Sequence, residues 1–476
     1  MRQHQTRLLL CHAVIAVVAA SCAVGPKYRK PDAPVPVAFK ELWQAAVPSD
    51  ATPRGAWWQS YGDDVLNSLE SAAETANQSI RQADAHYRAA LALVGESRAT
   101  LFPQLGVAVS ATRSSGGNGN ATSSSTPVTA ATVANSRRIS ATASWEVDLW
   151  GKLRRQLEES RSNAEASAGD LASARLSVEA TLAADYMKLR ALDSQLALLT
   201  ATLTEYRRSL EITRNRYAAG VAASTDVTQA ESQLASGEAQ LAAQSLQRAT
   251  LEHAIAILAG KTPEELTLSP APNMPAMPAL PSALPATLLQ RRPDVAAAER
   301  RVAAANAAIG VARSAYFPDL TLSATGGYQN SAWQNIFSAP NRFWSVGPAL
   351  AATVFDAGAR PAQNAAARAN YAAAVASYRQ TVLGALQSAD DALASLHYLA
   401  DEQAAAERAS AAAHKTLTAT QNQYKAGTVS YLNVVIAEST SLAEDNNLIA
   451  ARSSRLQAHV SLIEALGGES QAIAPR

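Results

Sequence analysis

Two very long stretches of the chain place apolar residues at helical spacing and contain no proline. They cover residues 153–217 and 363–424, and each holds a single glycine. A shorter helical pattern follows each of them, at residues 224–258 and 430–466, so the sequence predicts two long helical hairpins. Between residues 192 and 210, apolar side chains step by four and three positions, which is the a/d spacing of a supercoiled helical seam.

Two other regions alternate apolar and polar residues, and this period of two predicts β-strands. One hairpin is expected at about residues 104–149 and another at about residues 319–355. From Ile139 to Leu149 every second side chain is apolar. The pattern is typical of a strand between lipid and a wet lumen, and equally of a half-buried strand in a soluble domain. Pro348 falls inside the fourth predicted strand, where proline is unfavourable unless the strand is an edge.

Aromatic residues are only 5% of the chain, yet several gather around the second predicted hairpin. An aromatic belt at a membrane interface would explain this cluster, and so would a small soluble core. The residues concerned are Tyr328, Trp333, Phe337, Phe343 and Trp344.

These patterns occur twice, in the same order. A Tyr-x-x-Gly segment at residues 217–220 returns at residues 424–427, and a Phe-Pro pair at residues 102–103 returns at residues 317–318. The period is much longer than that of a solenoid, so the sequence predicts two tandem pseudo-repeats of one structural unit. The predicted organisation is a first repeat at residues 62–260, a proline-rich connector at residues 261–293, a second repeat at residues 294–468 and a C-terminal tail at residues 469–476.

The N-terminus has the features of an export signal at residues 1–21. Two arginines precede an apolar stretch, and small residues immediately precede Cys22. This arrangement resembles a bacterial lipobox, which implies cleavage before Cys22 and lipidation of its thiol; an ordinary signal peptide with an incidental cysteine is the alternative. Residues 22–61 are then an extended, proline-rich segment. Ala23, in place of an aspartate, resembles the sorting signal of outer-membrane lipoproteins.

Composition argues against several classes of function. The net charge is +1, which disfavours a nucleic-acid partner because such proteins need a basic surface. The two cysteines are Cys11 and Cys22, so no disulfide is expected within the exported chain. The seven histidines show no metal-ligand spacing and no nucleophile motif is present, so neither an enzyme nor a metal site is expected. The covalent lipid on Cys22 is the only non-protein group expected.

Four predicted strands are too few to close a barrel, for which about eight is the usual minimum. If the strands lie in a membrane they must close, because an open sheet edge leaves backbone groups unpaired in lipid. Several chains would therefore share one barrel, and a ring of long helical hairpins would have a bore. The sequence thus favours a conduit built by an oligomer.

Several motifs occur in a characteristic order: CAVGPKYRKP at residues 22–31, the two Phe-Pro pairs, DLWGK at residues 148–152, RRPD at residues 291–294 and the two Tyr-x-x-Gly segments. Together they resemble the outer membrane efflux protein family, and more closely its lipoprotein branch, the NodT/OprM-type partners of RND pumps. The resemblance implies a mainly α-helical homotrimer, in which four strands from each chain form one twelve-stranded barrel in outer-membrane lipid on a periplasmic α-barrel. A periplasmic membrane-fusion adaptor and an inner-membrane RND pump are the implied partners.

The resemblance assigns the two helix–turn–helix tips to adaptor docking and to the channel aperture. Gly220 and Gly427 can supply the positive φ of a tight helix exit, and Ser224 and Ser430 can cap the returning helices. The tip residues so assigned are Arg216, Tyr217, Gly220, Val221, Ser224 and Asp226 in the first repeat, and Tyr424, Lys425, Gly427, Thr428, Ser430, Tyr431 and Asn433 in the second.

Members of this branch often carry an aspartate shortly after the second tip, where it contributes to an acidic ring at the constriction. This chain has Ile436 at the corresponding position. Glu231 and Glu438 lie nearby in the sequence and are the candidates for an acidic constriction.

The predicted function is the outer membrane channel of a tripartite efflux system, a passive conduit that exports small molecules such as drugs or toxic compounds. Two alternatives stay open. One is the outer membrane channel of an ABC-type protein secretion system, and the other is a structural periplasmic coiled-coil lipoprotein whose strands form a soluble domain. The lipobox and the N-terminal motif favour the efflux role through the resemblance. The sequence does not identify the exported molecule.

Overall fold

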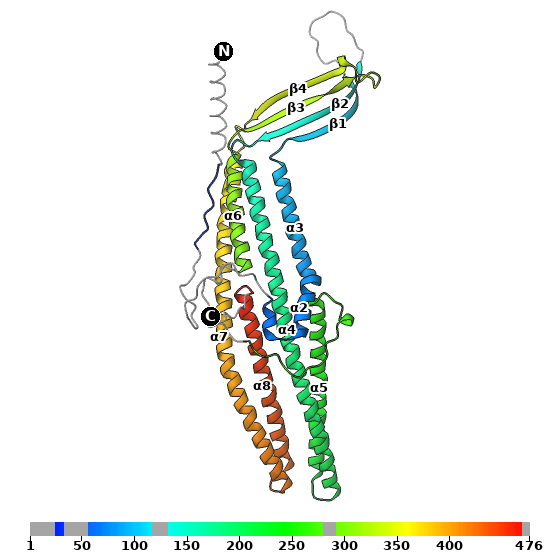
Figure 1. Ribbon diagram of the computed structural model, residues 1–476, viewed down its shortest axis with the longest axis vertical. Helices are drawn as coiled ribbons and strands as arrows, with labels where there is room; N and C mark the ends of the chain where they lie inside the picture. Colours follow the sequence, from blue (N-terminus) through cyan, green and yellow to red (C-terminus); the bar gives the residue numbers. More distant parts are fainter. Residues whose placement is uncertain (1–23, 33–55, 117–131, 279–291, 469–476) are drawn as a thin grey trace, which may run out of the picture. The chain divides into compact units, whose positions relative to one another are not determined.

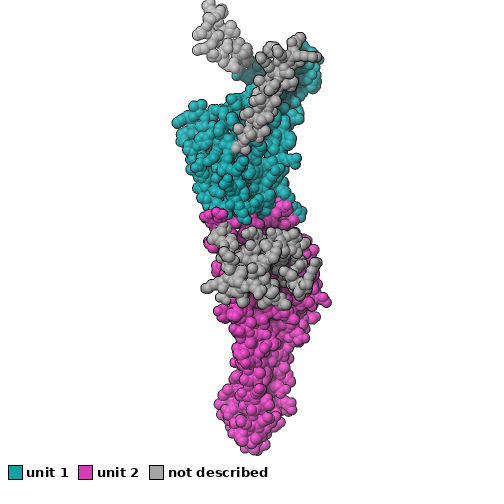
Figure 2. All heavy atoms as spheres, turned by 60° about the vertical axis from the view of Figure 1, so that its left-hand side comes forward, with its two compact units in different colours: residues 1–31, 88–166, 299–377 teal, residues 32–87, 167–298, 378–476 magenta. Residues whose placement is uncertain are grey.

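The computed structural model describes residues 24–32, 56–116, 132–278 and 292–468. Cys22, Ala23, the predicted signal peptide and the predicted C-terminal tail lie outside these residues. Within the described part of the chain, no helix has the length and hydrophobicity needed to cross a bilayer. The chain divides into two compact units, coloured separately in Figure 2: residues 1–31, 88–166 and 299–377 form unit 1, and residues 32–87, 167–298 and 378–476 form unit 2.

Each sequence half contains a 22-residue helix, two strands, a 67-residue helix and a 35-residue helix in that order, and in the first half α2 precedes them (Figure 1). The long helices and the returning helices confirm the predicted hairpins: α4 and α7 have 67 residues each, and α5 and α8 have 35 each. Such lengths far exceed the usual three turns of a globular helix. The helices are α2 (Asp64–Ala76), α3 (Gln78–Ala99), α4 (Lys152–Ala218), α5 (Ser224–Leu258), α6 (Pro293–Ser314), α7 (Ala359–Lys425) and α8 (Tyr431–Ala465).

Four antiparallel strands form one sheet in unit 1, in chain order (Figure 1). They are β1 (Gln104–Gly116), β2 (Thr132–Val147), β3 (Asp319–Asn330) and β4 (Arg342–Ala351), so both predicted hairpins are confirmed. The β2–β3 ladder joins the two sequence halves. Pro348 lies on β4, at the edge of the described sheet, where its missing N–H is tolerated. β4 ends before Val354 and Phe355, which the sequence had assigned to the strand.

The ladder register separates an apolar face from a polar face. Ile139 of β2 is opposite Val109 on one side and Tyr328 on the other, and Trp145 is opposite Leu322. Residues at the alternate positions are mainly serine, threonine and glycine. The apolar face is solvent-accessible in the isolated chain, with Leu105, Val107 and Trp344 more than 70% exposed. A face of this kind needs a covering of lipid or protein.

Aromatic side chains pin the strands of unit 1 to the helices that lead into them. The indole of Trp150 stacks on Phe317 with ring centroids 4.8 Å apart, and its Nε1 donates to the carbonyl of Pro318 at 2.8 Å. Trp145 Nε1 donates to the carbonyl of Leu101 at 3.0 Å. The N–H of Val24 donates to the carbonyl of Trp150 at 2.9 Å. The Phe-Pro and DLWGK motifs therefore share one structural role at the helix–sheet junction.

The core of unit 2 is built where α2, α4, α5 and α8 meet. Leu66, Leu182, Tyr186 and Ile255 are fully buried there. Asp63 begins α2 by accepting hydrogen bonds from the N–H groups of Val65 and Leu66, at 2.9 and 3.0 Å. This side-chain cap satisfies two of the four N–H groups that a helix leaves unpaired at its start.

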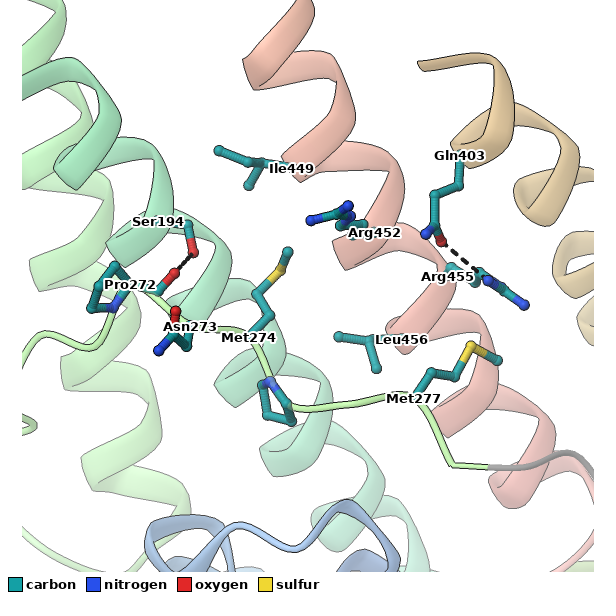
Figure 3. Close-up of a pocket in the computed structure, with 11 residues that line it drawn as sticks. Ser194, Pro272, Asn273, Met274, Met277, Gln403, Ile449, Arg452, Arg455 and Leu456 are labelled. Carbon is teal, nitrogen blue, oxygen red and sulfur yellow. Dashed lines mark hydrogen bonds between the residues drawn. The ribbon is translucent and has the colours of Figure 1, made fainter. Parts of the chain in front are cut away.

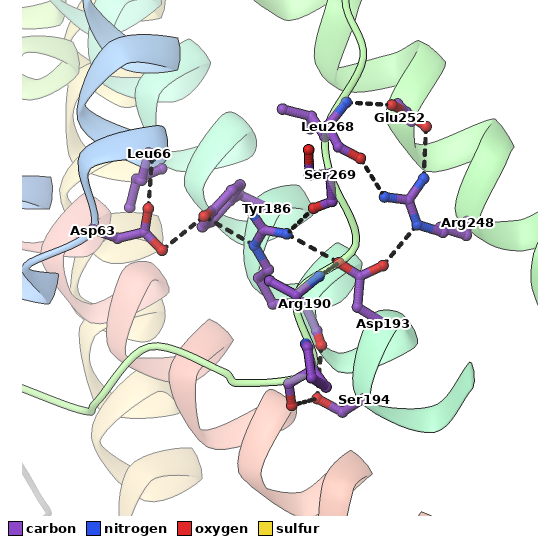
Figure 4. A network of polar contacts seen from close by, with 12 residues as sticks. Asp63, Leu66, Tyr186, Arg190, Asp193, Ser194, Arg248, Glu252, Leu268 and Ser269 are labelled. Carbon is purple, nitrogen blue, oxygen red and sulfur yellow. Dashed lines mark hydrogen bonds and ion pairs between the residues drawn. The ribbon is translucent and has the colours of Figure 1, made fainter. Parts of the chain in front are cut away.

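A buried polar network fixes the connector to the same core (Figure 4). Asp193 is 3% exposed and accepts from Arg190 at 3.0 Å, from Arg248 at 2.6 Å and from the N–H of Ala271 at 3.0 Å. The two guanidinium groups also donate to connector carbonyls: Arg190 to Ser269 at 2.9 Å and Arg248 to Leu268 at 2.7 Å. Asp193 therefore pairs with both buried cations that hold the connector against α4 and α5, and Glu252 supplies a second carboxylate to Arg248 at 2.7 Å.

Acidification is expected to destabilise unit 2 through His459. The ring is 1% exposed, its Nδ1 lies 2.7 Å from the Tyr61 hydroxyl, and burial lowers its pKa from 6.5 to about 4. The folded state therefore binds this proton less readily than the unfolded chain, so the contribution is complete above pH 6.5. It is lost as the pH falls from 6.5 to about 4, by about 3 kcal/mol in total.

Thermal unfolding of wild type and His459→Gln between pH 4 and pH 8 checks this expectation. The difference between the two proteins should shrink on acidification, whereas exposed His86, changed to glutamine, should leave the wild-type pH profile intact. A pH profile of His459→Gln parallel to that of the wild type would contradict it.

Candidate functional site

The two hairpin tips use the same backbone motif to leave the long helix. At the first tip, Gly220 has a φ of 76° and donates to the carbonyl of Tyr217 at 2.9 Å, while Val221 donates to Arg216 at 3.0 Å. At the second, Gly427 has a φ of 74° and the equivalent two bonds are both 3.0 Å. This is a Schellman motif, whose left-handed residue is best served by glycine. The prediction for both glycines is confirmed.

The predicted capping role is wrong for Ser224, and for Ser430 only the N-cap position is confirmed. Ala223, not Ser224, is the N-cap residue of α5, and Ser430 occupies the N-cap of α8 without a side-chain capping bond. The first turn is instead closed by the backbone, because Asp226 N–H donates to Ala223 and Asn433 N–H donates to Ser430, both at 3.1 Å. Asp226 still suits the first turn of α5, where a carboxylate meets the positive end of the helix dipole.

The two tips contact one another through an arginine and two tyrosines. The guanidinium carbon of Arg216 lies 4.6 Å from the ring centroid of Tyr424. The Tyr424 ring in turn lies 5.6 Å from that of Tyr431, which is only 2% exposed and whose hydroxyl is 2.9 Å from Ser209 Oγ. Leu210 and neighbouring apolar residues of α5 and α8 complete this cluster. We call Arg216, Tyr424, Tyr431 and Ser209 the tip contact.

The equivalent tyrosines of the two tips differ in their exposure to solvent. Tyr217 is 51% exposed and Val221 is 64% exposed, whereas Tyr424, the repeat counterpart of Tyr217, is half-buried in the tip contact. Lys425, Gly427 and Thr428 are exposed at the second tip. Each tip therefore presents accessible side chains, but Tyr424 joins the hairpins and Tyr217 does not.

The acidic candidates occupy different environments. Glu231 is half-exposed and pairs with Arg214 at 2.7 Å. Glu438 is 8% exposed, and its Oε2 has no hydrogen-bond partner among the described residues. Burial raises the pKa of Glu438, the nearby Glu205 raises it further, and a hydrogen bond from Gln421 opposes the shift. Ile436 is 55% exposed and lines a groove along α7 and α8 with Asn433 and several threonines.

A separate cavity of about 620 Å³ lies between the connector, α4, α7 and α8 of unit 2 (Figure 3). Arg455 donates to Gln403 at 3.1 Å, and Arg452 pairs with Glu407 at 3.0 Å. Ser194 donates to the connector carbonyl of Pro272 at 2.7 Å. Across the described residues, no group of three or more His, Cys, Asp or Glu side chains could hold a metal ion. The two arginines therefore join α8 to α7, and Ser194 fixes the connector to α4.

The architecture and tips can now be compared with known proteins. A family model described as "Outer membrane efflux protein" matches residues 69–261 and 284–468, which together make up most of the chain. The chain belongs to the outer membrane efflux protein family.

Relatives of this efflux protein match it along nearly its whole length. It is 30% identical over 431 residues to the pyoverdine export outer membrane protein OpmQ of Pseudomonas aeruginosa, covering 89% of each chain. It is 28% identical over 460 residues to the cation efflux system protein CusC of Escherichia coli K12, covering 95% of this chain and 98% of the relative. The solved outer-membrane channel OprN has a TM-score of 0.84 at 32% identity, covering 94% of this chain and 99% of that one.

The efflux protein is therefore the outer membrane component of an efflux system, located in the outer membrane and extending into the periplasm. Its fold is that of the TolC-type channels, mainly helical with one sheet. The family consists of channel and transport proteins rather than enzymes.

Proposed function

We propose that the protein is the passive, trimeric outer membrane conduit of a tripartite efflux system, with a periplasmic adaptor and an inner-membrane RND pump as its partners. The observation that carries the proposal is the pair of long hairpins with matched Schellman tips, joined by the tip contact. The wall of a channel requires helical hairpins of matching length. Each chain supplies two, each made of a 67-residue helix and a 35-residue helix.

Three chains would place their four-stranded sheets in one twelve-stranded barrel. The sheet supports this arrangement because β1 and β4 have unpaired edges in the isolated chain, and edges are not tolerated in lipid. The exposed apolar face would meet lipid and the serine- and threonine-rich face would line the lumen. A lipid on Cys22 would add a second membrane attachment.

The tips would form both the adaptor-docking surface and the periplasmic aperture. The exposed residues Tyr217, Val221, Lys425 and Thr428 are accessible to an adaptor. Arg216, Tyr424 and Tyr431 hold the two hairpins of a chain together. Glu231, which is partly exposed, suits an acidic lining better than Glu438, whose burial disfavours its charge.

Planar bilayer recordings on the purified full-length protein test the conduit. Reconstituted trimers should give discrete conductance steps that persist when the voltage is changed. In gels, heating should convert a trimer band to a monomer band. A protein that remains trimeric yet never conducts would overturn the conduit and favour a structural lipoprotein.

A further inference from the structure

The two ends of the sheet differ in charge. All four connections to helices leave the sheet at one end, where β1 and β3 begin and β2 and β4 end. At this end Lys152 pairs with Glu146 at 2.8 Å and with Asp319 at 3.5 Å. The rest of the described sheet and its connecting segments, residues 105–116, 132–145 and 320–351, contain no Asp, Glu or Lys and four arginines: Arg113, Arg137, Arg138 and Arg342. Among these described residues, the far end of the sheet carries only positive charge.

Three of the four arginines lie on the apolar face. Arg342 is paired with Tyr328, which is itself paired with Ile139 of that face. Residues paired across the strands on one face form a row. Arg137 lies two residues before Ile139 and therefore on the same face, one row further from the helices. Arg113 of β1 lies one row further still. Successive rows are about 7 Å apart. These three side chains occupy three successive rows of the apolar face. We call Arg113, Arg137 and Arg342 together the arginine row.

The side chain of Arg138 lies on the opposite face of the sheet from the arginine row. It alternates with Arg137 and so projects from the polar face, where its guanidinium carbon lies 4.3 Å from the ring centroid of Phe343. It carries the same charge at the same height of the sheet. Arg138 is thus a matched control for any property of the apolar face.

The surroundings of the arginine row suit a lipid headgroup. Arg113 and Arg342 are exposed, and Arg137 lies 5.7 Å from the ring of Trp333. Trp344, 73% exposed, lies on the same face one row closer to the helices than Arg342. No acidic residue in these segments neutralises the row. Apolar side chains such as Val107 and Val346 continue this face toward the helix-bearing end of the sheet and are open to acyl chains.

We propose that the arginine row binds the phosphate groups of outer-leaflet lipids whose acyl chains lie against the apolar face. The inference rests on the proposed placement of the sheet in the outer membrane with its helix-bearing end toward the periplasm. Guanidinium groups match phosphate bidentately, and they keep their charge at every physiological pH. Each arginine beside an anionic lipid surface strengthens binding about fivefold, so the row contributes on the order of 100-fold.

Native mass spectrometry of the full-length protein in detergent, titrated with diphosphorylated lipid A, tests the proposal. Wild type and Arg138→Gln should bind the lipid equally, and the triple variant R113Q/R137Q/R342Q should bind on the order of 100-fold more weakly. Lipid A stripped of its phosphates should not discriminate between these proteins. Single variants, each expected to lose about fivefold, keep the test decisive if the triple variant does not assemble.

Three results would overturn the arginine row: equal affinity of wild type and triple variant, an equal loss in Arg138→Gln, or complete displacement of lipid by inorganic phosphate at millimolar concentration. The last result would indicate a site for a free anion. Bilayer conductance of the same preparations separates this proposal from the conduit. If the protein conducts but the triple variant binds lipid A as tightly as the wild type, only the arginine row is refuted. If the trimers never conduct, the conduit is refuted whatever lipid they bind.

Discussion

Replacing Asp193 with asparagine is expected to lower the thermal midpoint of the protein by about 3–5 °C. The carboxylate is buried between Arg190 and Arg248, whose side chains are 5% and 14% exposed. Asparagine keeps the shape but removes the negative charge, and its amide donors face other donors. Removing one partner of a buried ion pair leaves uncompensated charge and costs about 3–5 kcal/mol. The helical circular dichroism signal, followed during heating of the detergent-solubilised protein, measures the effect.

Glu238→Gln is the matched control. Glu238 also pairs with an arginine, Arg207, at 3.0 Å, but both side chains are about half exposed. Exposed pairs contribute about 0–1 kcal/mol, so this variant should unfold close to the wild type. Equal midpoints for Asp193→Asn and Glu238→Gln would show that the network in Figure 4 does not stabilise the fold.

Tyr424→Ala is expected to produce the largest functional change, a rise in the mean conductance per reconstituted trimer. The substitution removes the cation–π contact with Arg216 and the ring contact with Tyr431 in every protomer. A cation–π contact contributes about 0.5–2 kcal/mol. The population of open tips should therefore rise about tenfold.

Tyr217→Ala is the internal control for this experiment, because Tyr217 is the repeat counterpart of Tyr424 and is 51% exposed. It should leave conductance near the wild-type value and weaken adaptor binding instead. If both alanine variants raise conductance equally, or neither does, the tip contact does not control the aperture.

Local rules allowed much of this fold to be predicted. Alternation of apolar and polar residues over Ile139–Leu149 predicted a strand, and apolar residues at helical spacing in the proline-free stretches predicted the long helices. Both patterns arise because one face of a regular element is apolar. Gly220 and Gly427 were predictable because a left-handed helix exit depends on one residue type. The lipidation of Cys22 stays a prediction.

The remaining features depend on contacts between distant segments. The pairing of Arg216 with Tyr424 requires the two hairpins to meet, and the network around Asp193 uses backbone carbonyls of the connector, which leave no trace in residue types. The serine side-chain caps failed for a different reason: backbone carbonyls at Ala223 and Ser430 already serve the first turn. A serine before a helix indicates a suitable start without determining which group accepts the bond.

Photocrosslinking at the tips in intact cells tests the central claim most directly. A photoreactive residue at Ala219 or Ala426, both exposed beside the turn glycines, would be activated and its captured partner identified by mass spectrometry. Capture of a periplasmic adaptor, with an RND pump co-purifying, is the predicted result. Capture of an adaptor with an ABC transporter would assign the channel to protein secretion. Intact trimers that capture only outer-membrane or cell-wall proteins at both positions would contradict docking at the tips.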